Sequence, residues 1–167
     1  MNEFKGLSQW ANDCDYVRGA VISPDAKVLI THHPHCVSIW DLPSGRVAGK
    51  VILDDLGYIA GIDDMAVDFA HRRIACWNGA DTPGNRLLRL VDMATGDTIK
   101  SRRVPECIQA ASFDPSGRFL VTGEGAGDRH LVRVWSADAL DEVGTLKGHE
   151  NSVGHIAISP DGSLLAT

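Results

Sequence analysis

The sequence predicts an all-β protein, and three observations support this fold class. Glycine and proline, which both favour tight turns, occur 17 and 7 times among the 167 residues. No segment keeps the helical period of about 3.6 residues over about 11 positions without a glycine or a proline. One pattern of turn and strand residues also recurs, with Pro115 and Pro160 in equivalent positions 45 residues apart. We therefore expect many short strands rather than a few long helices.

Each copy of the recurring pattern starts with an apolar residue and continues through a turn that contains proline. One polar residue, three apolar residues and a threonine follow. The copies lie at 22–31, 113–122 and 158–167. Pro24 precedes Pro115 by 91 residues, about two periods, so a degenerate copy without the proline is expected at 69–76. Periods of roughly 20–50 residues are typical of solenoids and propellers.

The first two strands of each unit flank this turn. Before the turn, the last two of three apolar residues keep the strand period of two, and the first marks the strand entrance. These trios are Val17, Ala20 and Ile22; Ile108, Ala111 and Phe113; and Val153, Ile156 and Ile158. After the turn, continuous apolar runs are typical of a strand that is buried on both faces. The runs lie at 28–30, 119–121 and 164–166.

A third and a fourth strand complete the unit. The third strand is expected at 37–41, 88–92 and 131–136. A polar turn then leads to an outer strand around Val47, Ile99 or Val143. Four short strands with a tight turn between each pair are typical of one propeller blade.

The domain organisation follows from this period. We expect units at 12–56, 57–102, 103–147 and 148–167, with the last unit truncated after its second strand. The predicted architecture is a partial β-propeller of about three and a half four-stranded antiparallel blades, whereas closed propellers have about four to eight. We expect the remaining blades either from missing sequence of a larger protein, of which this chain is a fragment, or from a second copy in a half-ring dimer.

The units resemble WD repeats, a family of β-propeller blades, over almost the whole chain. The most complete likeness runs from Gly148-His149 through Val153 to 159–167, which is similar to the Gly-His start, inner strand and Pro-Asp-Gly turn of that family. Trp40-Asp41 resembles the dipeptide that names the family, and Trp135-Ser136 is a near match. The resemblance implies a propeller whose end face binds peptides or partner proteins.

The resemblance also implies a set of structural residues. In the family, a histidine, a serine or threonine, an aspartate and the tryptophan of one blade form a buried hydrogen-bonded tetrad. Thr31, Thr122 and Thr167 match the hydroxyl position. Asp128 lies one residue further from Trp135 than the usual aspartate does.

Departures from the family pattern are equally informative. Gly148-His149 is the one Gly-His pair, and its blade stops before a third strand. Val104 stands at the histidine position of the third unit, and Asp13 at that of the first. No unit carries a complete tetrad, so apolar packing is expected to hold the blades.

Composition and charge exclude several classes of function. Hydrophobic residues make up 44% of the chain and charged residues 23%, which is typical of a globular protein. The net charge of −6 argues against a general nucleic-acid binder, because phosphate contact favours a basic face. No apolar run approaches the roughly 18–20 residues of a membrane span, and the first residues lack the pattern of a signal peptide. We therefore expect a cytoplasmic protein that contacts neither nucleic acid nor membrane.

The four cysteines are Cys14, Cys36, Cys76 and Cys107. They contain no C-x-x-C pair, so neither a zinc ribbon nor a thioredoxin-type motif is predicted. Their even number permits two disulfides, but we expect reduced cysteines in an intracellular chain with enough apolar residues for a core.

No catalytic, metal or cofactor site is predicted. The one cluster of ligand-type side chains comprises His32, His33, His35 and Cys36. A loop between two strands explains this cluster better than a zinc or copper site, because no acidic residue or second ligand group lies nearby in sequence. The glycine-rich segment 123–128 lacks the lysine of a phosphate loop and is predicted to be a hairpin loop. Asp63-Asp64 is predicted to be a polar strand entrance rather than a metal site.

Surface display is the function that remains. In the family, the entrances of the inner strands face one side of the ring, and by position this implies a candidate partner-binding face. Its residues are Tyr16, Arg18, Asp63, Met65, Cys107, Gln109, Ser152 and Gly154. Tyrosine, arginine and methionine suit such contacts because they bring a large contact area. We expect a non-catalytic protein–protein interaction scaffold without cofactors. The alternative is a propeller-type hydrolase or dehydrogenase whose catalytic residues lie outside this chain.

Overall fold

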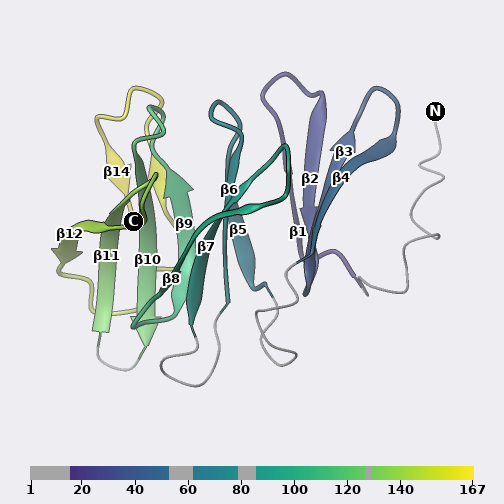
Figure 1. Cartoon of the computed structure of the whole chain (residues 1–167). Coiled ribbons are helices and arrows are strands. Elements are labelled where there is room, and N and C mark those ends of the chain that lie inside the picture. Colours follow the sequence, from purple (N-terminus) through teal and green to yellow (C-terminus); the bar gives the residue numbers. More distant parts are fainter. Residues whose placement is uncertain (1–15, 53–61, 79–85, 127–128) are drawn as a thin grey trace.

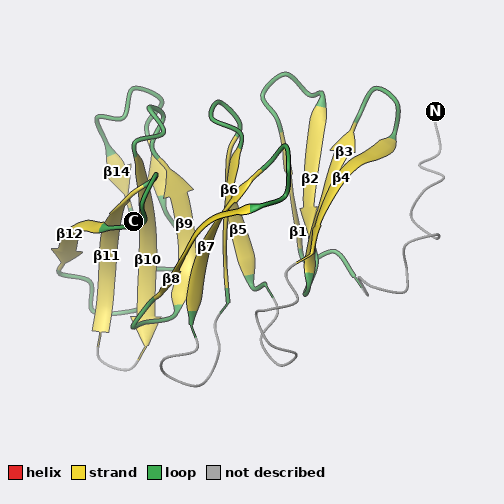
Figure 2. Ribbon diagram, viewed as in Figure 1, coloured by secondary structure: helices red, strands yellow, loops and turns green. Residues whose placement is uncertain are grey.

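The computed structural model describes residues 16–52, 62–78, 86–126 and 129–167, and this part of the chain contains strands and no helix (Figures 1 and 2). The first sheet consists of β1 (Gly19–Ile22), β2 (Val28–His32), β3 (Cys36–Asp41) and β4 (Arg46–Ile52). The second consists of β5 (Asp64–Asp68), β6 (Arg73–Trp77), β7 (Leu87–Asp92) and β8 (Thr98–Arg103). The third consists of β9 (Ile108–Phe113), β10 (Phe119–Ala126), β11 (Arg129–Ser136) and β12 (Glu142–Lys147). The last consists of β13 (Ala157–Ile158) and β14 (Leu165–Ala166).

Each sheet is an antiparallel meander with its strands in chain order. The sheets stand side by side, with inner strand β5 beside β9 and β9 beside β13 (Figure 1). Three four-stranded blades are thus followed by a two-stranded half blade. The prediction of an all-β partial propeller with about three and a half blades is confirmed.

The outer strand of every complete blade departs from ideal pairing at the same place. The register between the third and fourth strands shifts at Ile39/Trp40 in the first blade, at Leu90/Val91 in the second and at Val134/Trp135 in the third. A bulge increases the local twist of a strand pair. The three blades therefore share a fine geometric detail as well as a topology.

The turn between the first two strands is set by its sequence. Gly117 and Gly162 adopt positive φ angles of 67° and 72°, which glycine accepts without a steric penalty. Ala26 takes the same turn position in the first blade with a φ of 56°. The predicted Pro-Asp-Gly type turns thus close the inner hairpins of these blades.

The degenerate copy in the second blade is shifted from its predicted alignment. Val67 pairs with Ile74 exactly as Ile22 pairs with Leu29, so Phe69 lies in the turn and not at the end of the inner strand. Asp68 pairs with Arg73 across the turn. Because this copy lacks the proline, no residue in the sequence marked where the turn begins.

Apolar side chains fill the space between neighbouring blades. One cluster joins the first and second blades around Ile30, Ile62 and Ile74, each of which is fully buried. A second cluster joins the second and third blades around Trp77 and Trp135. A smaller third cluster of Val121, Val132 and Val153 joins the third blade to the half blade. Inter-blade apolar packing is therefore the main stabilising interaction, as burial of such surface predicts.

The cysteines are in two oxidation states. Cys36 is disulfide-bonded. Cys76 is a buried free thiol and Cys107 a half-buried one. The expectation of fully reduced cysteines is therefore wrong for Cys36.

Among the described residues, no helix is long and apolar enough to cross a membrane.

Candidate protein-interaction site

The entrance of β1 and the segment leading into β5 bring three residues of the predicted face together. Arg18 Nη1 donates to the Ile62 carbonyl oxygen at 2.8 Å and lies 3.3 Å from Asp63 Oδ1. Arg18 Nη2 donates to the Tyr16 hydroxyl at 3.3 Å, and the guanidinium carbon lies 5.7 Å from the centre of the Tyr16 ring. The side chains of Arg18 and Asp63 are 30% and 48% exposed. An arginine held between an aromatic ring and a carboxylate is thus presented to solvent where the first two blades meet.

Met65 lies elsewhere. It occupies the second position of β5 and is only 7% exposed, packed in the cluster between the first and second blades. The next residue, Ala66, is equally buried against the third blade, so both faces of β5 are covered and only Asp64 at the strand entrance is exposed. Met65 is therefore a core residue and not a surface anchor.

Asp64 instead contacts a buried histidine of the first blade. Its Oδ1 lies 3.3 Å from Nε2 of His32, which is 2% exposed. Burial disfavours ionisation of Asp64, but the hydrogen bonds from His32 and from the Met65 amide hold its pKa below the ordinary value. A Cβ at Gly19 would collide with the His32 ring, so glycine at this position admits the histidine.

The third blade contributes Cys107 and Gln109 to the predicted face. Gln109 in β9 is exposed, and Cys107, just before β9, is half-buried. The Cys107 carbonyl oxygen accepts a hydrogen bond from the Gly125 amide at 3.1 Å. The structure therefore presents Gln109 more openly than Cys107.

The half blade contributes Ser152 and Gly154, both exposed on either side of the buried Val153. Ser152 packs against Gly125 so closely that a Cβ on the glycine would collide with the serine side chain. The predicted face thus runs across all four blades, although its members divide into one contacting group, Tyr16–Arg18–Asp63, and separate residues beyond it.

The histidine cluster is divided among structural roles. His33 Nδ1 lies 3.1 Å from the Tyr16 carbonyl oxygen, which only accepts, so Nδ1 carries the proton. His33 Nε2 lies 3.3 Å from Thr31 Oγ1. Burial lowers the pKa of His33, which favours the neutral ring that this arrangement requires. The described residues contain no group of three or more His, Cys, Asp or Glu side chains placed to share a metal ion.

The tryptophan of the first blade is anchored by a threonine. Trp40 Nε1 donates to Thr31 Oγ1 at 3.0 Å, and Thr31 is in turn in contact with His33. Asp41, the next residue, accepts the Ser44 amide with Oδ2 at 3.0 Å and so shapes the following turn. We name the Trp40–Thr31–His33 series the first-blade clasp.

The third blade has an equivalent clasp with a different third member. Trp135 Nε1 donates to Thr122 Oγ1 at 2.8 Å, and Thr122 donates to Glu124 Oε1 at 3.1 Å. Glu124 is fully buried, and its Oε2 lies 2.8 Å from Arg133 Nε. Burial raises the pKa of Glu124 despite the hydrogen bonds from Arg133 and Thr122.

Sequence reasoning identified the threonine and the tryptophan of each clasp but missed the third member. In both blades this residue stands two positions after the threonine, on the same strand or just beyond it. A polar residue at this spacing, His33 or Glu124, was the available signal. Asp128, the predicted aspartate, lies outside the described residues, and in the half blade His149 Nε2 contacts Thr167 Oγ1 at 2.7 Å.

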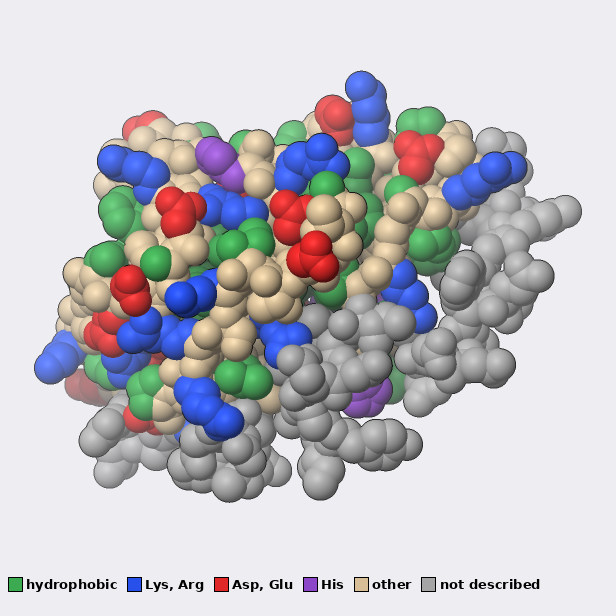
Figure 3. Space-filling model, viewed as in Figure 1, with side chains coloured by type: hydrophobic (Ala, Val, Ile, Leu, Met, Phe, Trp, Pro, Cys, Tyr) green, Lys and Arg blue, Asp and Glu red, His purple; other side chains and the backbone are tan. Residues whose placement is uncertain are grey.

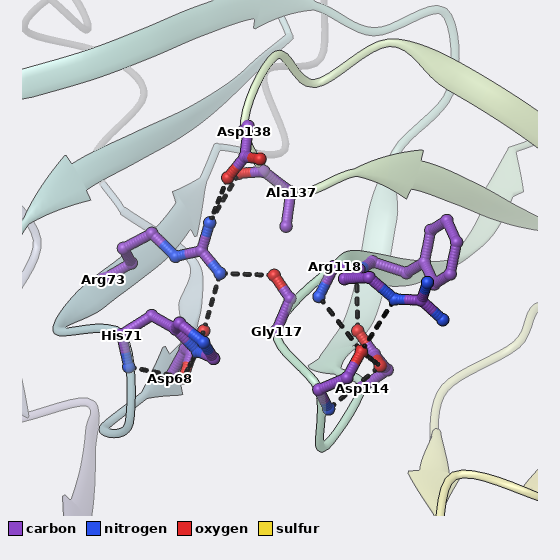
Figure 4. Close-up of polar contacts among 10 residues, drawn as sticks. Asp68, His71, Arg73, Asp114, Gly117, Arg118, Ala137 and Asp138 are labelled. Atoms are coloured by element: carbon purple, nitrogen blue, oxygen red, sulfur yellow. Dashed lines mark hydrogen bonds and ion pairs between the residues drawn. The ribbon is translucent and has the colours of Figure 1, made fainter.

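A second missed feature is a buried arginine that links the second and third blades (Figure 4). Arg73 contacts Asp68 Oδ2 and Asp138 Oδ1, each at 2.8 Å. It also donates to the carbonyl oxygens of Gly117 and, at 3.2 Å, Ala137. Nothing in the sequence marked Arg73 as buried, because its partners Gly117, Ala137 and Asp138 lie in turns of the next blade.

Charged side chains of both signs are interspersed over the face shown in Figure 3. This mixed pattern agrees with the modest net charge of −6.

Comparison with known proteins identifies the repeat. Residues 99–136 and 140–167 match the family WD domain, G-beta repeat. A bromodomain and WD repeat-containing protein of Dictyostelium discoideum is 44% identical over 61 residues, which are 36% of this chain and 2% of that protein. The human serine-threonine kinase receptor-associated protein is 34% identical over 71 residues, which are 42% of this chain and 19% of the relative.

A third relative is the tRNA (guanine-N(7)-)-methyltransferase non-catalytic subunit of Caenorhabditis elegans, 31% identical over 74 residues. The match covers 44% of this chain and 18% of that subunit. The chain therefore spans less than a fifth of the length of each of these curated relatives.

Solved structures show the same fold at low sequence identity. A chain of the mitotic checkpoint complex superposes with a TM-score of 0.70 at 18% identity, over 90% of this chain and 43% of that one. A chain of Kuenenia stuttgartiensis hydrazine synthase superposes with a TM-score of 0.75 at 18% identity, over 92% of this chain and 42% of that one. These likenesses and the blade topology show that the chain has a β-propeller fold, and the family match identifies its residues 99–136 and 140–167 as WD40 repeats.

Proposed function

We propose that this chain is a non-catalytic protein-interaction scaffold that binds a protein or peptide partner on the face formed by the inner-strand entrances. The observation that carries the proposal is the exposed Tyr16–Arg18–Asp63 group at the junction of the first two blades, with Gln109 and Ser152 on the same face of the following blades. Aromatic and arginine side chains are enriched at protein interfaces and dominate their energetics.

The chemistry of this group indicates what it recognises. The Arg18 guanidinium is oriented by the Ile62 carbonyl and flanked by the Tyr16 ring, so little freedom is lost when it binds. Its ion pair with the half-exposed Asp63 is weak and open to competition by a carboxylate or a peptide carbonyl. A peptide segment with an acidic side chain therefore suits the junction.

The relatives support a binding role rather than a catalytic one. One of them is named as the non-catalytic subunit of a methyltransferase, and another as a receptor-associated protein. Both descriptions fit a propeller that works by holding other proteins.

Site-specific photocrosslinking tests the proposal. A benzophenone amino acid is placed at Gln109 on the proposed face and, as a matched control, at Lys100 on the exposed outer strand β8. Defined crosslinks to partner proteins are expected from Gln109 and not from Lys100. Arg18→Glu should remove these crosslinks, whereas Arg46→Glu at the opposite end of the blade should not. Equal crosslinks from both positions, or crosslinks unaffected by Arg18→Glu, would contradict the proposal.

A further inference from the structure

A cleft of about 650 Å³ opens between the first and second blades at the end of the strands opposite the proposed face. Its walls come from the β1–β2, β3–β4, β5–β6 and β7–β8 turns and the strand ends beside them. Val28, Trp40, Phe69 and Met93 form an apolar lining. Val28, Phe69 and Met93 are only partly buried, so the cleft is accessible apolar surface.

The equivalent space between the second and third blades is filled by the chain itself. Arg73 projects into it and bonds to the β9–β10 turn at Gly117 and to the β11–β12 turn at Ala137 and Asp138 (Figure 4). Its guanidinium carbon also lies 5.6 Å from the centre of the Phe113 ring. The second inter-blade space thus accepts an arginine side chain with an aromatic ring, two carbonyl groups and two carboxylates around it.

Structural equivalence relates the two spaces residue by residue. The amide of Met93 donates to the Arg72 carbonyl exactly as the amide of Ala137 donates to the Arg118 carbonyl, both at 2.8–2.9 Å. Met93 and Ala94 in the first space therefore correspond to Ala137 and Asp138 in the second.

Arg73 itself corresponds to Val28. Each stands opposite the last residue before the inner turn, since Asp68 pairs with Arg73 and the Ser23 amide donates to the Val28 carbonyl at 2.8 Å. Valine is too short to cross the space and carries no donor. The first cleft therefore has no side chain at the Val28 position that bridges its two walls as Arg73 does in the second space.

The charges around the first cleft favour a basic occupant. The lining has two carboxylates, Asp25 and Asp41, against the single guanidinium of Arg72. Asp25 is hydrogen-bonded to Ser23 and lies 3.8 Å from Lys27 Nζ, so Asp41, which accepts the Ser44 amide with Oδ2, is the carboxylate more open to a basic ligand. Because Trp40 is only 6% exposed, the partly buried Phe69 is the more accessible aromatic surface for a guanidinium.

We propose that this cleft binds a peptide segment of a partner protein that carries an arginine between apolar side chains, the arginine taking the place that Arg73 takes between the next two blades. The proposal rests on the proposed function in that the occupant is a protein, but it uses the opposite end of the blades. A negative result for one binding site would therefore leave the proposal for the other site untouched.

Calorimetry with a defined peptide tests the inference. The probe is acetyl-Ala-Leu-Arg-Leu-Ala-amide, compared with the same peptide carrying glutamate in place of arginine, titrated into the full chain. The arginine peptide is expected to bind at least about tenfold more tightly. Val28→Arg should fill the cleft from within and weaken binding at least about tenfold, while Lys147→Ala on the exposed end of β12 leaves it unchanged.

A second variant tests the same cleft even if Val28→Arg does not fold. Ala94 is exposed and stands where Asp138 contacts Arg73, so Ala94→Asp supplies the missing carboxylate and should tighten binding of the arginine peptide about threefold or more. Equal affinity for the two peptides, or no response to either variant, would overturn the inference. So would a concentration-dependent dimer that Val28→Arg dissociates, because a second copy would then occupy the cleft.

Discussion

At the scale of single residues, Arg73 shows how much a buried charge depends on its surroundings. Its guanidinium lies between a carboxylate of its own blade, Asp68, and the turns of the next blade. Removing one member of a buried ion pair is costly because the other charge remains buried without compensation. The same side chain in a solvated turn would contribute almost nothing.

Replacement of Arg73 by methionine tests this view. We expect the free energy of unfolding to fall by about 2 kcal/mol, because Asp68, only 7% exposed, loses its guanidinium partner and keeps only the hydrogen bonds from His71. Arg72→Met, one position earlier and on an exposed side chain, should change stability by less than about 0.5 kcal/mol. Urea denaturation measures both. Equal losses in the two variants would show that Arg73 acts only as surface charge.

The contribution of Glu124 to stability is expected to change with pH in the opposite direction to that of most acidic residues. Burial raises its pKa above the ordinary value of 4.5, so the folded chain holds this proton to higher pH than the unfolded chain does. The stability due to the protonated form is present below the ordinary value and is lost as pH rises through the raised pKa. Relative to the wild type, Glu124→Gln should therefore become progressively more stable as pH rises from 4.5 towards neutrality.

Glu142 is the control for this experiment. Hydrogen bonds from Thr145 and Arg133 lower its pKa, so its contribution to stability is present above the ordinary value and is lost as pH falls. The free energy of unfolding of Glu142→Gln should therefore fall relative to that of the wild type as pH rises. Parallel pH dependence of the two variants, measured by urea denaturation, would contradict the assignment of Glu124.

Residue-scale prediction from sequence succeeded where a side chain's role depends on local pattern. Thr31 and Trp40, identified from the repeat, do form a hydrogen-bonded pair. Met65 was placed on the surface because the family face was transferred by position, whereas the first blade covers this side of β5 and buries it. Arg73 could not be found, because its burial depends on the turns of another blade.

At the scale of the strand, close approach between blades depends on glycine. A Cβ at Gly123 in β10 would lie 2.5 Å from the Val153 carbonyl oxygen, which belongs to the backbone of the half blade. That distance is shorter than carbon and oxygen tolerate without movement of the chain. A Cβ at Gly144 in β12 would have no other atom within 4 Å.

These two glycines form a matched pair. Gly123→Ala is expected to destabilise the protein by about 1–3 kcal/mol, because the half blade must move away from the third blade. Gly144→Ala should be neutral within about 0.5 kcal/mol. Hydrogen exchange of the Ser159 amide, which donates to the Leu164 carbonyl at 2.9 Å, reports on the half blade. Faster exchange in both variants alike would show that contact at Gly123 is not the cause.

The positions of the strands could be predicted from the sequence where a recognisable turn marked the end of one strand and the start of the next. The Pro-Asp-Gly type turns of the first and third blades and of the half blade allowed their inner hairpins to be placed from the sequence. In the second blade the proline is absent, and the side chains Val67 and Phe69 are both apolar at the same strand phase. Period alone does not distinguish a strand end from a turn two residues later.

At the scale of the whole molecule, the half blade leaves an apolar strand at its margin. Leu164 and Leu165 are 71% and 37% exposed beside β14, whose pairing partner is β13. Exposed strand edges with apolar side chains template association with other chains. The sequence predicted this half blade because the period was known, but not how its side chains would be exposed.

Leu164→Lys is expected to reduce concentration-dependent association of this chain, because a charge at the edge opposes strand pairing. Leu146→Lys on β12, where the side chain is 50% exposed on a complete blade, is the control and should change association little. Light scattering after size-exclusion chromatography measures the mass. A discrete dimer that is unaffected by Leu164→Lys would instead favour the half-ring arrangement.

The third member of each clasp has a consequence for how this propeller tolerates change. In the first blade the hydrogen-bonded series continues from His33 to the Tyr16 carbonyl oxygen in the segment before β1, whereas in the third blade it ends at Glu124 and Arg133 within the blade. The Val104 side chain, at the histidine position of the third unit, is buried and apolar, and its amide donates to the Arg86 carbonyl oxygen at 3.0 Å. A change of length before β9 should therefore leave Trp135 anchored, whereas a change before β1 that displaces Tyr16 should weaken the anchor of Trp40.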